Sequence, residues 1–355
     1  MKLAAVRAIA SLAEENVPDE VSEAYGEGAL TFGRDLIIPK PVDPRLITAV
    51  APAVAKAAMD SGIAQAPITD WDQYRRRLEM RLGNDSTFSR NIATRAARAP
   101  KRVVFAEAER YKVLKAAEMA MDEGIAHPIL LGRRHRIEAL IEENNLELDG
   151  ATILDARAVD QEERRKAFGK VFFERRKRHG LTALEAERYM RKRNYFGSML
   201  VDQGEADALV SGLTRNYPNV IRPALHSIGK AKGVDKVAGM YILQTKNGPM
   251  FFADTTVNTN PSAEDIVNIT LLTAEAVRNL RIVPRIALLS YSNFGSSQGH
   301  DAEKMAEAAR YLHVHHPELI VDGEIQANFA MNQDKLGESF PFSALHKRQV
   351  NTLIF

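Results

Sequence analysis

From residue 88 onward, short apolar segments alternate with helical segments, and this alternation constrains the fold more than any other feature. Apolar segments at residues 102–106 and 128–131 flank a helical segment near residues 111–123. This spacing is typical of a strand, a crossover helix and a second strand, for which a parallel sheet is the default. The sequence therefore predicts an α/β fold with parallel-rich sheets.

The alternation continues to the last residue. Long helical stretches are predicted at residues 161–178 and 183–203, and strands at residues 206–210, 237–244, 249–253, 285–290, 319–321 and 350–355. Residues 246–248, which include Asn247-Gly248, predict a hairpin turn, because this pair accepts positive φ.

The first 85 residues differ from the rest. They predict helices near residues 2–13, 45–61 and 70–82, with Asp70 as the N-cap of the third. Three prolines at residues 37–44 exclude helix there and favour an extended path. Residues 83–87 indicate a boundary, so we expect two parts, residues 1–85 and 86–355.

The composition is that of a folded protein with no strong charge. The chain has 45% hydrophobic and 26% charged residues, and 48 basic against 46 acidic residues give a net charge of +2. This balance gives no reason to expect nucleic acid or a membrane as partner. With no signal pattern and no long apolar run, we expect a cytoplasmic protein. The absence of cysteine excludes disulfides and thiolate chemistry.

Small polar residues stand where several of the predicted strands end. They occupy residues 211–214, 254–256, 290–293 and 322–324. Because the carboxyl ends of parallel strands line a common crevice, these turns predict a site for a phosphate or acyl oxygen. The alternative is that turns after strands are polar simply because loops meet water.

In order along the chain, several segments resemble the phosphate acetyltransferase (phosphotransacetylase) family. The resemblance spans residues 99–355 and is carried by residues 103–108, 208–212, 221–223, 252–254, 289–292 and 321–326. Residues 211–218 and 292–296 more closely resemble the transacetylase-like domain fused behind bacterial NADP-dependent malic enzymes. Residues 37–47 and 52–58 resemble the last part of the malic enzyme domain of those hybrids.

The resemblance implies a two-lobed phosphotransacetylase-like α/β domain preceded by a helical tail of a malic enzyme domain. It also implies that the transacetylase serine, arginine and aspartate lie downstream of the segment matching residues 352–355. The malic enzyme's catalytic pair, metal ligands and nucleotide loop would lie upstream of Met1. We therefore expect a piece of a longer protein with no catalytic residues and no cofactor of its own. The parent would use NADP and Mg²⁺ or Mn²⁺, with the malic enzyme domain in cis, and would form a homo-oligomer.

Two arginines match those that family members carry toward acetyl phosphate or CoA, namely Arg222 and Arg176. Guanidinium suits both ligands because it stays charged and grips phosphate bidentately. Since Arg222 precedes Pro223, we expect it at a helix start, where backbone amides would help to hold an anion. A helix-start ion pair is the alternative for Arg222, and a solvated basic run is the alternative for Arg176. The other predicted ligand-binding residues are Ser211, Thr214, Ser290, Ser292 and Asn293.

Two further groups could suggest a metal. The histidines at residues 313–316 have no spaced partner, and Asp254, Asp322 and Glu324 at predicted strand ends could bind Mg²⁺. We expect no metal at either place, because the transacetylase family needs none.

The loops depart from those of active transacetylases, with larger residues at 215–218 and Phe294 in place of a small residue. Such residues would crowd the pocket, so we expect acetyl-CoA, or a related phosphate-bearing molecule, to bind as an allosteric effector. The leading interpretation is therefore a regulatory module of an NADP-dependent malic enzyme, which decarboxylates malate to pyruvate. The alternatives are a piece of a genuine phosphate acetyltransferase and a structural oligomerisation module. We also expect the first lobe to expose a sheet edge, with weak hydrogen-exchange protection at residues 102–131 and 350–355.

Overall fold

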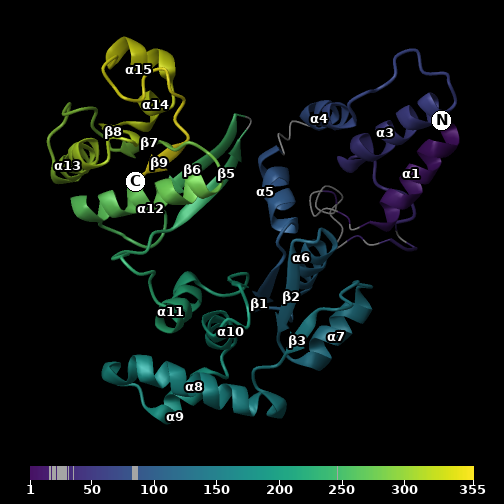
Figure 1. The fold of residues 1–355 in the computed structure, drawn as a ribbon, viewed down its shortest axis with the longest axis horizontal. Helices are drawn as coiled ribbons and strands as arrows, with labels where there is room; N and C mark the ends of the chain where they lie inside the picture. The colour runs from purple at the N-terminus through teal and green to yellow at the C-terminus, as the bar shows by residue number, and fades with distance from the viewer. Residues whose placement is uncertain are drawn as a thin grey trace. The chain divides into compact units, whose positions relative to one another are not determined.

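The computed structural model of the chain describes residues 1–15, 17, 21, 30, 32–34, 36–81, 87–245 and 247–355. These residues form two compact units, Met1–Gly229 and Lys230–Phe355 (Figure 1). Most of the boundary predicted at residues 83–87 lies outside the described residues, so the division into residues 1–85 and 86–355 stays a prediction. Residue 246 of the predicted turn also lies outside them.

The first unit begins with helices α1 (Lys2–Glu14), α3 (Arg45–Asp60) and α4 (Trp71–Arg81). The Asp70 carboxylate accepts a hydrogen bond from the Gln73 backbone N–H at 2.8 Å, which confirms the N-cap of α4. The three prolines predicted an extended path before α3, but part of this path is a turn. The Asp43 N–H donates to the Lys40 carbonyl at 2.9 Å, and the buried Asp43 carboxylate then accepts from the Arg45 N–H at 3.0 Å. A turn therefore leads into α3.

Four parallel strands form the sheet of the first unit, in the order β3-β2-β1-β4. The strands are β1 (Lys101–Phe105), β2 (Ala126–Leu131), β3 (Thr152–Leu154) and β4 (Ala208–Val210). Three of them confirm the predicted alternation. The sequence did not reveal β3, because three residues are too few to show a strand pattern.

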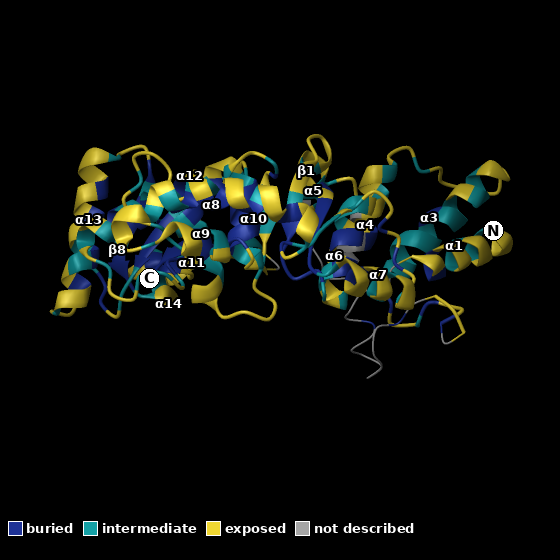
Figure 2. Ribbon diagram, turned by 90° about the horizontal axis from the view of Figure 1, so that it is seen from below, coloured by how far each residue is buried: buried dark blue, intermediate teal, exposed yellow. Residues whose placement is uncertain are grey.

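Helices cover both faces of this sheet. Phe105 and Leu130 face a core with α6 (Tyr111–Asp122) and α7 (Arg134–Glu143), which follow α5 (Thr87–Ala97). Val104 and Leu131 face the opposite core, formed with α8 (Glu162–Arg176), α9 (Ala183–Tyr189) and α10 (Arg193–Asp202). Most of α10 is buried and is dark blue in Figure 2. Alternate residues of the strands thus point to opposite layers of helix.

The helix predicted at residues 183–203 is in fact two helices. The chain turns at Met190–Lys192, where the Lys192 N–H donates to the Tyr189 carbonyl at 2.9 Å. Met190 is fully buried, whereas Arg191 and Lys192 are exposed. The turn allows Met190 to be buried while Arg191 and Lys192 remain exposed. No glycine or proline in the sequence marks this turn.

The second unit contains a five-stranded sheet in the order β5-β6-β9-β7-β8. Its strands are β5 (Met240–Thr245), β6 (Gly248–Ala253), β7 (Arg285–Leu289), β8 (Ile320–Ile325) and β9 (Thr352–Ile354). β5 pairs antiparallel with β6, as the predicted hairpin requires, and the other pairs are parallel. The strands predicted at residues 285–290 and 350–355 are confirmed and lie side by side.

Helices also cover both faces of the second sheet. Ile286, Leu288 and Ile354 pack against α12 (Ala263–Asn279) and α13 (His300–His315). Ala287 and Leu353 face the other core, with α14 (Ala327–Ala330) and α15 (Gln333–Ser339). β1 and β9 are therefore interior strands, whereas β3 and β4 form the edges of the first sheet. The expected exposed edge exists but does not lie at β1 or β9, and the weak hydrogen-exchange protection stays a prediction.

No helix within the described ranges is long and apolar enough to cross a membrane.

Candidate functional site

A cavity of about 790 Å³ opens in the first unit at the carboxyl edge of its sheet. Residues that follow each of the four strands line it: Ala106 and Glu107 after β1, Arg133 after β2, Arg157 after β3 and Arg215 after β4. β4 lies on the opposite side of β1 from β2 and β3. The strand order therefore reverses between β1 and β4, and this switch point is where open α/β sheets bind ligands.

The cavity is strongly cationic. Of the described residues that line it, seven are arginine or lysine and three are aspartate or glutamate. Each of the three carboxylates already accepts hydrogen bonds from backbone N–H groups nearby. In the part of the chain that the structure describes, no ion pair joins Arg157, Arg215 or Arg222 to a carboxylate. The cavity therefore has cationic capacity left for an anionic ligand.

Glu107 anchors the loop that follows β4. Its carboxylate accepts hydrogen bonds from the backbone N–H groups of Gly212, at 2.8 Å, and Thr214, at 2.9 Å. The Thr214 hydroxyl donates to it as well, and the Ser211 hydroxyl donates to the Asn194 side-chain oxygen at 3.0 Å. Burial alone would raise the pKa of Glu107, but these hydrogen bonds outweigh burial and the pKa is lowered. Ser211 and Thr214 therefore use their hydroxyls within the protein, and neither residue lines the cavity; their role toward a ligand stays a prediction.

Arg222 lies in helix α11 (Tyr217–Ser227), not at its start. Pro218 occupies the first turn of this helix, while Pro223 is inside it, so the expectation that Pro223 begins the helix is wrong. Pro218, Arg222 and His226 are four residues apart and line the cavity from one face of α11. The N-terminal amides of α11 belong to a turn before Arg222.

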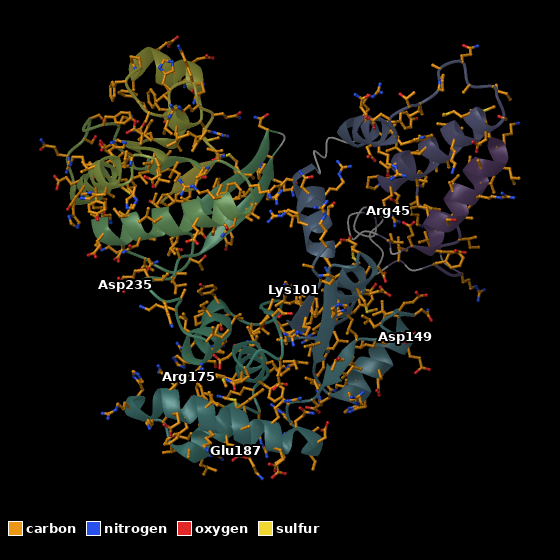
Figure 3. All side chains as sticks on the ribbon, in the orientation of Figure 1. Arg45, Lys101, Asp149, Arg175, Glu187 and Asp235 are labelled. Carbon is orange, nitrogen blue, oxygen red and sulfur yellow. The ribbon has the colours of Figure 1, made fainter. Side chains whose placement is uncertain are left out.

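Arg175 fixes the far end of α11. Its guanidinium donates to the Asp202 carboxylate at 2.6 Å and also to the backbone carbonyl of Ser227, the last residue of α11. Arg175, labelled in Figure 3, thereby links α8, α10 and α11. These bonds hold the helix that carries Arg222.

The charges of Arg176 and Arg222 both affect a pair of side chains, Tyr195 and His226. The Tyr195 hydroxyl lies 3.2 Å from Nδ1 of His226. Burial lowers the pKa of His226, and the charges of Arg176 and Arg222 lower it further. The structure therefore brings the two predicted arginines to one side of the cavity, although only Arg222 lines it.

The remaining predicted residues belong to the second unit. The Ser292 hydroxyl is fully buried and donates to the Glu324 carboxylate at 2.9 Å. The Asn293 side-chain oxygen accepts from the Gln326 N–H at 2.8 Å, and Ser290 accepts from the Ser292 N–H at 3.2 Å. These side chains hold the loop after β7 in shape, and their role toward a ligand stays a prediction.

Asp254 and Asp322, two of the three carboxylates that could suggest a metal, also accept hydrogen bonds within the protein. Asp254 accepts hydrogen bonds from four backbone N–H groups, including that of Gly239 at 2.8 Å. Asp322 lies within β8, not after a strand, and accepts from the Ser343 hydroxyl at 2.8 Å. Among the described residues, no group of three histidine, aspartate or glutamate side chains is placed to hold a metal ion. These residues do not fit Mg²⁺, and the sequence contains no glycine-rich G-x-G-x-x-G loop for NADP.

The chain belongs to the phosphate acetyl/butaryl transferase family, whose family model matches residues 87–355. A phosphotransacetylase from Streptococcus pyogenes has a similar structure, with a TM-score of 0.69 and 29% identity over 77% of this chain and 82% of that one. The EutD phosphotransacetylase from Staphylococcus aureus gives a TM-score of 0.67 at 26% identity, over 76% of this chain and 82% of that one. The predicted fold class is confirmed.

Curated relatives extend the similarity to the N-terminal helices. An NADP-dependent malic enzyme from Haemophilus influenzae is 42% identical over all of this chain and 47% of its own length, and one from Escherichia coli is 40% identical with the same coverage. The chain therefore spans about half the length of these relatives. A phosphate acetyltransferase from Clostridium acetobutylicum is 31% identical over 72% of this chain and 78% of that enzyme. The resemblance to hybrid malic enzymes is confirmed.

Proposed function

We propose that this chain is the phosphotransacetylase-like part of an NADP-dependent malic enzyme and that its cationic cavity binds acetyl-CoA as a regulatory ligand. The observation that carries the proposal is a set of three arginines, Arg157, Arg215 and Arg222, around a cavity at the carboxyl edge of a transacetylase-type sheet; no described carboxylate forms an ion pair with any of them. Guanidinium groups without carboxylate partners attract phosphate groups, and acetyl-CoA carries three.

The relatives support the malic enzyme half of the proposal. Similarity covers the whole chain, including α1, α3 and α4, which precede the transacetylase-type region. In this proposal the protein oxidises malate to pyruvate with NADP and Mg²⁺ or Mn²⁺ held by a malic enzyme domain in cis, and it assembles as a homo-oligomer. This chain contributes the effector site and none of the catalytic groups.

Calorimetric titration of the 355-residue chain with acetyl-CoA tests the proposal. Arg222→Ala removes one guanidinium from the cavity, so we expect a loss of affinity of about tenfold or more, since hydrogen bonds to charged groups are worth about 1.5–3 kcal/mol. Arg178→Ala is the matched control, because Arg178 is exposed and does not line the cavity. An Arg222 variant that binds as tightly as the unaltered chain contradicts the proposed site.

The second candidate function is phosphate acetyltransferase activity. The Clostridium acetobutylicum enzyme favours it, because the match covers most of that enzyme's length. Formation of acetyl phosphate from acetyl-CoA and inorganic phosphate by this chain would support this candidate. Binding of acetyl-CoA without turnover would support the regulatory role.

A further inference from the structure

One carboxylate in the cavity wall is surrounded by three arginines. The Arg133 guanidinium donates to Glu109 Oε2 at 2.9 Å and to Oε1 at 3.2 Å, and the Arg133 backbone N–H adds a bond of 2.9 Å. Arg136 lies 3.6 Å from Glu109 and Arg193 lies 3.9 Å from it. These arginines come from the start of α7 and the start of α10. The Arg133 hydrogen bonds lower the pKa of Glu109 to about 2.

This set of donors is also suited to phosphate. A bidentate guanidinium, a backbone N–H at the start of a helix and additional cations are what phosphate oxygens bind in proteins. Arg193 is beyond hydrogen-bond distance of Glu109, and its side chain is 33% exposed. Arg193 therefore retains donors that a ligand can use.

The cavity is much larger than one phosphate group needs. Its volume of about 790 Å³ lies within the range of roughly 300–1,000 Å³ that sites for whole cofactors and drug-sized ligands occupy. The arginines also come from separate elements. Arg133 immediately precedes α7 and Arg193 begins α10, whereas Arg215 lies in the loop after β4 and Arg222 lies in α11.

We propose that Arg133 and Arg193 form a second anion subsite, which Glu109 occupies in place of a phosphate until a ligand with at least two phosphate groups binds in the cavity. This inference rests on the proposed function, because it assigns the phosphate chemistry of the same cavity. Glu109 is a built-in competitor, and it lowers affinity for ligands that reach this subsite. A ligand with one phosphate binds at Arg222 and does not compete with Glu109.

The test compares CoA, which carries three phosphates, with acetyl phosphate, which carries one. Glu109→Gln keeps the shape of the side chain and removes its charge. We expect CoA to bind about three- to fivefold more tightly, near the upper end of what one partly exposed ion pair is worth. Acetyl phosphate affinity should stay within about twofold, because charges outside direct contact are screened by salt. Glu138→Gln is the matched control, because Glu138 pairs with Arg134 on α7 outside the cavity.

A second variant keeps the test independent of how well Glu109→Gln folds. Arg193→Gln should weaken CoA binding and leave the affinity for acetyl phosphate unchanged. In the double variant with Glu109→Gln, it should cancel the increase in CoA affinity that Glu109→Gln gives alone. Unchanged or weaker CoA binding by Glu109→Gln, or an equal gain for acetyl phosphate, overturns the second subsite and leaves the proposed function standing. If the unaltered chain binds neither ligand, the proposed function itself fails.

Discussion

The Lys115 ammonium group donates a hydrogen bond of 2.7 Å to the backbone carbonyl oxygen of Val17, which lies 98 residues earlier in the chain. Both residues are buried, with Lys115 6% and Val17 3% exposed. A buried lysine is costly unless its charge is paired or hydrogen-bonded. This bond therefore attaches the N-terminal segment to α6 of the transacetylase-type region.

Replacing Lys115 should loosen that attachment. Lys115→Met keeps most of the side-chain volume but leaves the Val17 carbonyl without this donor, so we expect a loss of about 1–3 kcal/mol in the free energy of unfolding. Urea unfolding measures it. Lys170→Met, at an exposed position of α8, is the control and should change stability by less than about 0.5 kcal/mol. Equal stability of the two variants would show that the bond is not stabilising.

Removing the charge of Glu107 should disturb the loop after β4. In Glu107→Gln, the amide group faces a backbone N–H, either that of Gly212 or that of Thr214, and cannot accept from it. We expect about 1–3 kcal/mol lower stability and weaker acetyl-CoA binding, because this loop leads directly into α11 and Arg222.

Paired unfolding and binding measurements check the Glu107 prediction. Glu163→Gln is the control, because the Glu163 side chain is 90% exposed. If Glu107→Gln loses stability but binds acetyl-CoA normally, the loop does not position the cavity arginines.

Stability should fall in acid through Glu109. Its folded-state pKa of about 2 lies below its ordinary value of 4.5, so its ion pair with Arg133 contributes stability above pH 4.5. That contribution is lost as the pH falls from 4.5 toward 2. Urea unfolding at pH 6.5, 4.0 and 3.0 should show a steeper loss for the unaltered chain than for Glu109→Gln. Parallel pH profiles would mean that Glu109 titrates normally.

Hydrogen exchange should be slow in two strands. β1 and β9 each pair with a strand on both sides, so their amides are bonded within the sheets. Mass spectrometry of exchanged peptides should show stronger protection in β1 and β9 than in β5, which forms an edge. Rapid exchange at residues 352–354 would contradict the central position of β9.

The sequence predicted the layered architecture well because it depends on patterns that repeat. Apolar strands at residues 102–106 and 285–290, and the helix cap at Asp70, are each visible within a few residues. The short strand β3 and the turn at Met190–Lys192 were missed, because neither carries a glycine, a proline or a long apolar run. Elements with a clear pattern within a few residues could therefore be predicted, and elements without such a pattern could not.

The candidate site was harder to predict because its main interactions join distant residues. The bond from Gly212 to Glu107 spans 105 positions, and no local pattern reveals such a contact. Ser211 and Thr214 were expected to meet the ligand, yet their hydroxyls are hydrogen-bonded within the protein. The run of three basic residues at 191–193 is a local signal for the cavity wall, because all three line the cavity.

The strand at residues 352–354 lies between β6 and β7, which end about 100 and 65 residues earlier in the chain. Until residues 352–354 have been synthesised, β6 and β7 have no strand between them, because β9 is the neighbour that they share. The central strand of the second sheet is therefore the last of its five strands to be made, so the sheet cannot be completed until all the other strands have been synthesised.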